Sequence, residues 1–177
     1  MFVLGHLGFG AQMARALHLK LPKKAFWLGA LLPDLIDKPV YYFLSWRTGA
    51  QGAAVPIIHG TRSAGHTLLF LMTLSVMSLY LNRSWMRALT WGVISHLALD
   101  FVSDQIVGFP QLPLASHLPL SYPMRGEIPA AQHLSLSSHL FKLRQPFFLI
   151  TEILGGLLLL YPIGKHRSLL KEPPPRP

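Results

Sequence analysis

The chain has 177 residues, of which 51% are hydrophobic and only 13% are charged, against about 25% charged residues in an ordinary soluble domain. Sixteen Lys and Arg and seven Asp and Glu give a net charge of +9, and with so few charges overall this excess suits a lipid bilayer better than nucleic acid. The lack of cysteine excludes disulfides, zinc ribbons and thiol catalysis, so a bound metal would need His, Asp and Glu ligands.

The hydrophobic pattern predicts one domain in residues 1–164, an all-α bundle of about four to five apolar helices embedded in a membrane. Its apolar segments are residues 2–19, 25–46, 63–82, 88–109 and 145–164. Segment 63–82 is the clearest, because it has no formal charge and reaches the roughly 20 residues that a bilayer crossing needs. The first two segments carry charges, and Pro33 and Pro39 should open the backbone of the second, so these two either span or enter half way.

Proline-rich and basic stretches lie between and after the apolar segments. Residues 105–145 contain five prolines and predict a proline-rich loop, or lid, between the last two helices. Residues 165–177 predict a basic, proline-rich, disordered tail, and no basic residue precedes the first segment, so we expect no cleaved signal peptide. If all five segments cross, nine of the sixteen basic residues fall on one side, which the positive-inside rule makes cytoplasmic. We therefore expect a multi-pass protein of the cell membrane with a cytoplasmic tail.

The same topology places the ionisable side chains of the helices toward the outer leaflet. His96 and Asp100 form an i,i+4 pair on one helix face, and Asp104 extends this face by another turn. One imidazole nitrogen and one carboxylate on such a face can hold the same cation. The alternative is a hydrogen bond that only ties helices together. Because an ionisable residue in a bilayer span is costly and functional by default, we prefer the metal interpretation.

Two earlier stretches add candidate residues. Asp34 and Asp37 lie three positions apart between two prolines. Helix capping is the alternative interpretation, and it accounts well for one of these aspartates but poorly for two. His66 opens the third apolar segment, with Arg62 one turn before it. The guanidinium of Arg62 suits a phosphate or carboxylate, and a snorkelling anchor at the membrane interface is its alternative. His59, seven residues before His66, is a second-rank metal ligand.

An ordered series of short motifs runs through about the first 125 residues. It consists of Gly5-His6, Pro33-Asp34-x-x-Asp37, Arg62-x-x-x-His66-Thr-Leu-Leu and Gly92-x-x-x-His96-x-x-x-Asp100. The series resembles the bacterial membrane-bound metal-dependent hydrolase family, the YdjM-like proteins, which look like membrane-embedded relatives of the all-helical zinc-dependent phospholipase C and single-strand nuclease superfamily. The metal ligands that this resemblance implies are Asp34, His66, His96 and Asp100. It also implies that Asp100 bridges to a second ion held partly by His6. Family members often have a histidine where this chain has Thr61, a place that His59 would have to fill.

Together, the residues and the resemblance predict metal-assisted hydrolysis of a phosphoester. One or two divalent ions, Zn or alternatively Mn or Mg, would lower the pKa of a bound water to about 7. Asp37 or Asp104 would take its proton, and Arg62 would contact the anion. Because the expected site lies near a leaflet, a membrane lipid or a lipid-linked phosphate is the expected substrate.

Two rival functions use the same residues. In one, the His and Asp stripe passes protons or a cation, as buried ionisable residues do in transporters. In the other, the polar groups only bind helices to one another in an assembly protein. Nucleic acid is not expected as a partner, because the basic residues lack interleaved aromatic residues and already have a topological use.

Overall fold

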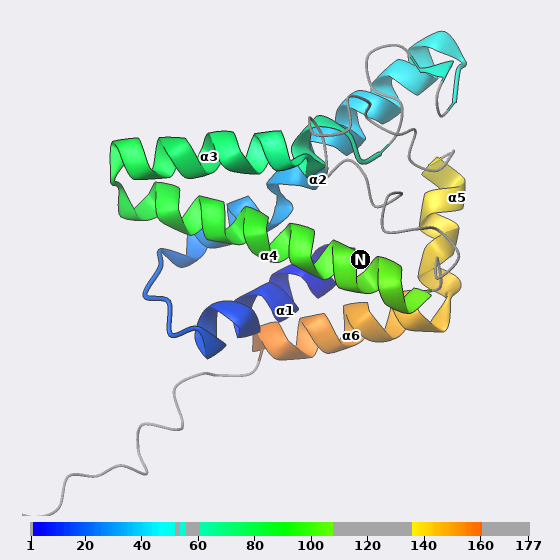
Figure 1. Cartoon of the computed structure of the whole chain (residues 1–177). Coiled ribbons are helices and arrows are strands. Elements are labelled where there is room, and N and C mark those ends of the chain that lie inside the picture. The colour runs from blue at the N-terminus through cyan, green and yellow to red at the C-terminus, as the bar shows by residue number, and fades with distance from the viewer. Residues whose placement is uncertain (1, 52–53, 56–60, 108–135, 161–177) are drawn as a thin grey trace, which may run out of the picture.

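The structure is a computed structural model that describes residues 2–51, 54–55, 61–107 and 136–160 (Figure 1). Its elements are α1 (Val3–Ala16), α2 (Lys23–Thr48), the 3-10 turn η2 (Ala64–His66), α3 (Leu68–Leu81), α4 (Ser84–Val107), α5 (Leu136–Phe141), the 3-10 turn η4 (Lys142–Arg144) and α6 (Pro146–Leu160). Every regular element of the described residues is helical, so the predicted all-α class is confirmed. The predicted tail and most of the proline-rich loop lie outside these residues, and the described end of that loop is helical, as α5 and η4.

Helices α2 and α4 cross with their backbones in contact. A Cβ on Gly29 would lie 2.0 Å from the carbonyl oxygen of Leu89, and a Cβ on Gly92 would lie 2.2 Å from that of Phe26. Glycine is needed at both positions, since any side chain would push the two helices apart. The crossing sets the first half of α2 against the first half of α4, so the ionisable residues that follow on each helix are brought together.

Helices α1 and α6 pack side by side in a similar way, as Figure 1 shows. A Cβ on Gly8 would lie 2.1 Å from the carbonyl oxygen of Gly155, and a Cβ on Gly155 would lie 2.3 Å from that of Leu4. Helix α3 packs against α4 through a core formed by Leu74, Met86, Leu89, Val93 and Leu97. Because α1, α2 and α3 all contact α4, this helix lies at the centre of the bundle.

Helix α2 continues through 26 residues although it contains Pro33 and Pro39. The prediction that these prolines open the backbone is therefore wrong. Each proline removes one N–H donor from the helix, but tertiary packing holds the backbone in its helical path. Pro33 is buried against Gly65, where a Cβ would lie 2.9 Å from the Pro33 Cα atom. Asp34 and Asp37 consequently project from nearly the same side of a continuous helix.

None of the helices in the described part of the chain is both long enough and apolar enough to cross a membrane. The clearest predicted span, 63–82, contributes only α3, whose 14 residues are about 21 Å long against a hydrocarbon core of about 30 Å. The residues before α3 form η2, and Thr67 then caps α3 by accepting a hydrogen bond from the Phe70 N–H at 3.1 Å. Helices α2 and α4 are longer, with 26 and 24 residues, but they carry charged groups. The five-span topology, with the outer-leaflet site and cytoplasmic tail that depend on it, is not supported.

Candidate metal centre

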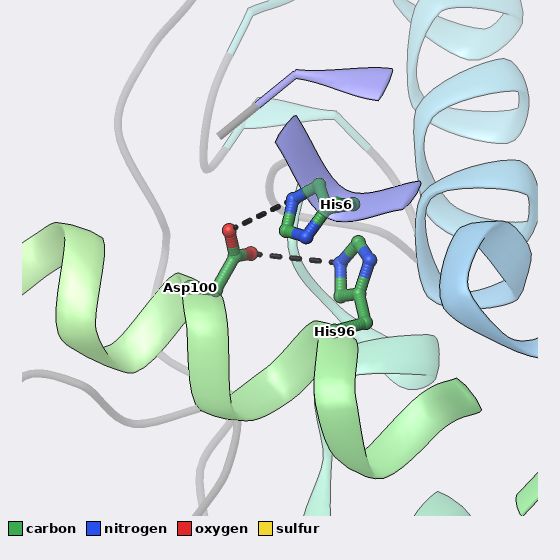
Figure 2. Close-up of side chains that lie close together, drawn as sticks. All are labelled: His6, His96 and Asp100. Atoms are coloured by element: carbon green, nitrogen blue, oxygen red, sulfur yellow. Dashed lines mark ion pairs between the residues drawn. The ribbon is translucent and has the colours of Figure 1, made fainter. Parts of the chain in front are cut away.

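Most of the ionisable residues singled out in the sequence meet in one cluster inside the bundle. The cluster consists of His6 from α1, Asp34 and Asp37 from α2, His66 from η2, and His96 and Asp100 from α4. All of these side chains except that of Asp34 are buried. Figure 2 shows three of them, with the two carboxylate oxygens of Asp100 directed at the rings of His6 and His96. His59 lies outside the described residues.

One carboxylate oxygen of Asp34 and one of Asp100 lie close to the same two imidazole nitrogens. The Nε2 atoms of His66 and His96 are 3.2 Å apart. Oδ1 of Asp34 lies 3.6 Å and 3.9 Å from these two nitrogens, and Oδ2 of Asp100 lies 3.5 Å and 3.6 Å from them. Tetrahedral bonds of 2.0–2.1 Å to zinc place neighbouring ligand atoms about 3.3 Å apart. The ligand atoms of Asp34, His66 and His96 therefore lie close enough together for a zinc-sized ion, and those of His6, His96 and Asp100 form a second such group.

His96 is held as a neutral imidazole with one nitrogen turned to the cluster. Its Nδ1–H donates to the carbonyl oxygen of Ala30 at 2.7 Å, which leaves the Nε2 lone pair directed inward. Burial, and then the neighbouring imidazole of His6, lower the pKa of His96 to about 3. The ring is thus uncharged near pH 7, the form in which histidine binds metals.

His66 is oriented by Asp37, which lies behind it. The imidazole Nδ1–H donates to Oδ2 of Asp37 at 2.7 Å, and the same carboxylate accepts hydrogen bonds from the Ser63 N–H at 2.7 Å and the Gly65 N–H at 3.0 Å. Asp37 is fully buried. A carboxylate that accepts from the far nitrogen of a histidine is the usual support of a metal-binding imidazole. In this arrangement Asp37 sits on the opposite side of His66 from the converging ligand atoms.

The two inward-facing imidazoles present a specific electrostatic problem. With Nδ1 protonated in both His66 and His96, both Nε2 atoms carry lone pairs, and these face each other at 3.2 Å. Two lone pairs at this distance need a proton or a metal cation between them. Burial lowers the pKa of His66, but hydrogen bonds with Asp100 and Asp37 raise it above its ordinary value. The site therefore attracts a positive charge to this point.

His6 and Asp100 form the second half of the cluster. The His6 ring stacks on that of His96 with centroids 3.9 Å apart and an interplanar angle of 15°, and its Nε2 lies 3.2 Å from Oδ1 of Asp100. Neither ring nitrogen of His6 has an aligned hydrogen-bond partner among the described residues, although the side chain is 1% exposed. Asp100 thus turns one oxygen to His6 and the other to His66 and His96, as a carboxylate that bridges two ions would.

Two cations neutralise the carboxylates of the cluster. Arg62 contacts Oδ2 of Asp100 at 2.9 Å through Nη2 and Oδ2 of Asp104 at 2.5 Å through Nη1. Burial alone would raise the pKa of Asp100, but the guanidinium of Arg62 holds it well below its ordinary value. Lys38 contacts Oδ2 of Asp34 at 2.5 Å, which leaves Oδ1 directed at the imidazoles. Asp104 lies at the outer edge of the cluster, and among the described residues it does not belong to either set of side chains that could hold a metal ion together.

Sequence reasoning missed three groups that support the site. The Ala30 carbonyl has no side-chain signal, and Lys38 was visible only as the i+4 neighbour of Asp34. Glu152 of α6 accepts hydrogen bonds from the backbone N–H groups of Phe2, Leu4 and Gly5, at 3.1, 2.8 and 2.8 Å. A charged residue within an apolar segment was its only signal, and its partners lie at the other end of the chain.

The fold and the cluster define a class of protein, an α-helical bundle with a buried His and Asp site suited to a divalent metal. A family model described as YdjM inner membrane protein matches residues 1–167, so the chain belongs to this family. The resemblance inferred from the motifs is confirmed at this level, and the family description supports a membrane location. No curated protein and no solved structure matches the chain.

Proposed function

We propose that the protein is a membrane-associated, metal-dependent hydrolase of phosphoesters. The observation that carries this proposal is the pair of buried imidazoles whose Nε2 atoms lie 3.2 Å apart, with carboxylate oxygens of Asp34 and Asp100 3.5–3.9 Å from them. A single shared proton would join the two imidazoles alone, whereas the carboxylate oxygens of Asp34 and Asp100 that approach the same two nitrogens add the donors that a metal ion needs.

The proposed ligands are His66, His96, Asp34 and Asp100. Two imidazoles and two carboxylates without a thiolate suit zinc, and manganese or magnesium as alternatives. When bound, such an ion supplies a water with a pKa of about 7 and a Lewis acid for a phosphoryl oxygen. His6 and the second oxygen of Asp100 offer ligands for a second ion.

The outer residues of the site have separable roles in the proposed reaction. Asp104 is the better candidate to accept a proton, because its side chain is 23% exposed and the oxygens of Asp37 are engaged by His66 and backbone donors. Arg62 is 29% exposed and can contact a substrate anion at the edge while it holds Asp100. Asp37 is assigned as a positioning residue that keeps the His66 lone pair directed inward.

The surface of the bundle favours a lipid or lipid-linked substrate. Large apolar side chains are exposed on α3 and α6, among them Met72, Val76, Leu79, Leu149, Ile153 and Leu157. Basic side chains are exposed where α2 and α4 begin and in the connections before them, namely Lys20, Lys23, Lys24, Arg83 and Arg87. Trp27 and Trp85 are exposed beside them, and no acidic residue occurs in 1–33 or 38–99. Apolar area flanked by tryptophan and basic residues suits a bilayer surface with anionic lipids.

Elemental analysis combined with an activity assay tests the proposal. Protein purified in detergent without chelator should retain zinc or manganese and hydrolyse a phosphodiester, either bis(p-nitrophenyl) phosphate or phosphatidylglycerol in micelles. His96→Ala and Asp100→Ala should lose metal and activity together. His18→Asn is a matched control, because His18 is exposed outside the site and asparagine tolerates its positive φ of 52°.

The outcomes separate the rival functions. Metal-free protein that still cleaves phosphoesters would contradict the proposal, as would metal-loaded protein that cleaves none of them. Cation or proton flux into liposomes without turnover would instead favour the transfer function, in which the groups from buried His66 and Asp100 to half-buried Arg62 and Asp104 form the route.

A further inference from the structure

The first turn of α1 is completed by a residue from the far end of the chain. Phe2 occupies the N-cap position, where its apolar side chain cannot accept a hydrogen bond, and the first turn contains no acidic residue. The carboxylate of Glu152 on α6 accepts from three backbone N–H groups of this region instead. Free N–H groups at a helix start need acceptors, and a negative charge there also interacts favourably with the helix dipole.

The contact between α1 and α6 fixes the distance over which Glu152 acts. Gly8 and Gly155 let the two backbones touch, and the rings of Phe2 and Phe148 meet edge to face with centroids 5.8 Å apart. The glycine contact holds α6 close enough for the Glu152 side chain to reach the α1 backbone, and the aromatic pair adds to the stability of the helix contact. The arrangement sets both the depth and the direction of the first turn.

His6 belongs to this same turn, directly after the last backbone donor to Glu152. Its N–H donates to the Phe2 carbonyl at 3.1 Å, the hydrogen bond that begins the helix. The His6 ring has no aligned hydrogen bond of its own in the described part of the protein, so the backbone path, stacking on His96 and the contact with Asp100 set its position. The position of Nε2 opposite Asp100 therefore depends on how the first turn of α1 is held.

We propose that Glu152 is a positioning residue of the metal centre: by capping α1 it holds His6 where Nε2 faces the carboxylate of Asp100. This inference rests on the proposed function, because it assigns His6 to the metal. Glu152 is itself no ligand, since its oxygens are engaged by the α1 backbone.

Glu152→Gln tests the proposal with little change of volume. The glutamine carbonyl oxygen still accepts, but the NH2 group that replaces the other oxygen only donates, so at least one N–H of α1 would face another donor. We expect divalent metal binding, measured with zinc and a competing chelator, to weaken about 10- to 100-fold, the usual effect of removing an outer support of a ligand. In a His6→Ala background the same substitution should have no further effect, because its target is gone. Should Glu152→Gln fail to fold, Glu152→Asp provides the same comparison by withdrawing the oxygens while keeping the charge.

Phe148→Leu is the matched control for general loosening of the α1–α6 contact. It removes the aromatic contact with Phe2 but leaves the carboxylate in place, and we expect it to lower the melting temperature without the loss of zinc affinity. Equal weakening of zinc binding by Phe148→Leu and Glu152→Gln would show a merely structural role. Additive losses in Glu152→Gln and His6→Ala would also overturn the proposal.

A metal-free measurement keeps this inference separate from the proposed function. In protein with ¹⁵N-labelled histidine, the ring nitrogen signals of His6 should shift in Glu152→Gln while those of exposed His18 stay unchanged. If the wild-type protein binds no zinc, the proposed function fails and these spectra alone decide whether Glu152 holds His6. Unchanged His6 signals would refute the positioning role.

Discussion

Replacing Asp37 by alanine should both destabilise the protein and weaken its metal binding. Its buried carboxylate accepts hydrogen bonds from the backbone N–H groups of Ser63 and Gly65 and from the His66 ring, at 2.7, 3.0 and 2.7 Å. A buried donor that loses its acceptor costs about 1–3 kcal/mol, so three donors amount to at least about 3 kcal/mol. Many domains have a total stability of only about 5–15 kcal/mol, so the variant would be marginal.

Asp37→Asn is the graded comparison. The amide oxygen of asparagine can still accept from some of the three donors. The free energy of unfolding should therefore fall by about the cost of a single lost buried hydrogen bond, about 1–3 kcal/mol. Both variants free His66 from its negatively charged partner, and metal affinity should fall about 10- to 100-fold. Chemical unfolding of the metal-free protein in detergent gives the first quantity, and chelator competition gives the second. An alanine variant within about 0.5 kcal/mol of wild type, the range of ordinary surface substitutions, would refute the role assigned to Asp37.

Three further outcomes follow from packing, charge and metal binding. Gly155→Ala should destabilise the bundle by about 1–3 kcal/mol in thermal unfolding, because the new Cβ would lie 2.3 Å from the Leu4 carbonyl oxygen. Gly156→Ala is the control and should be neutral or stabilising, because its Cβ would lie 3.6 Å from the Leu4 side chain. Equal effects of the two variants would contradict the contact between α1 and α6. Arg62→Lys should keep the metal content but weaken the binding of inorganic phosphate, measured by calorimetry, about tenfold, which is the effect of losing one charged hydrogen bond. Unchanged phosphate binding would show that Arg62 does not contact the anion. In wild-type protein, the free energy of unfolding should be about 2.7 kcal/mol lower after chelation than at a free metal concentration of 100 times Kd. The free energy of unfolding of His66→Ala should be the same under both conditions.

Helical periodicity was enough to predict the central pair of the cluster. His96 and Asp100 are four residues apart on an unbroken helix, and local spacing decides that they share a face. The roles of the two aspartates on α2 could not be predicted in this way. Asp37 supports His66 and Asp34 faces the cluster because η2 folds over Pro33, a long-range contact that no local pattern encodes.

The apolar segment 63–82 and the helix that it forms differ in extent for a related reason. Hydropathy counts the composition of 63–82, but the first residues of that segment form η2 and a cap, and Gly65 followed by Thr67 was the available signal for a helix that starts later. For α2 the error was the reverse, because the predicted helix was shorter than the observed one. Local geometry predicts that Pro33 and Pro39 break the helix, but packing of Pro33 against Gly65 keeps α2 helical. Glu152 was not assignable because its partners are separated from it by almost the whole sequence.

The proposed ligand atoms come from α1, α2, η2 and α4, and this distribution has a consequence for how the protein would mature. During translation His6 is made before Asp34 and His66, and Asp100 is the last of the proposed ligands to be added. No nascent fragment that ends before α4 contains the full set of donors, so the centre cannot be loaded during early translation. Acquisition of the ion should therefore be a late event that reports completed assembly of the bundle.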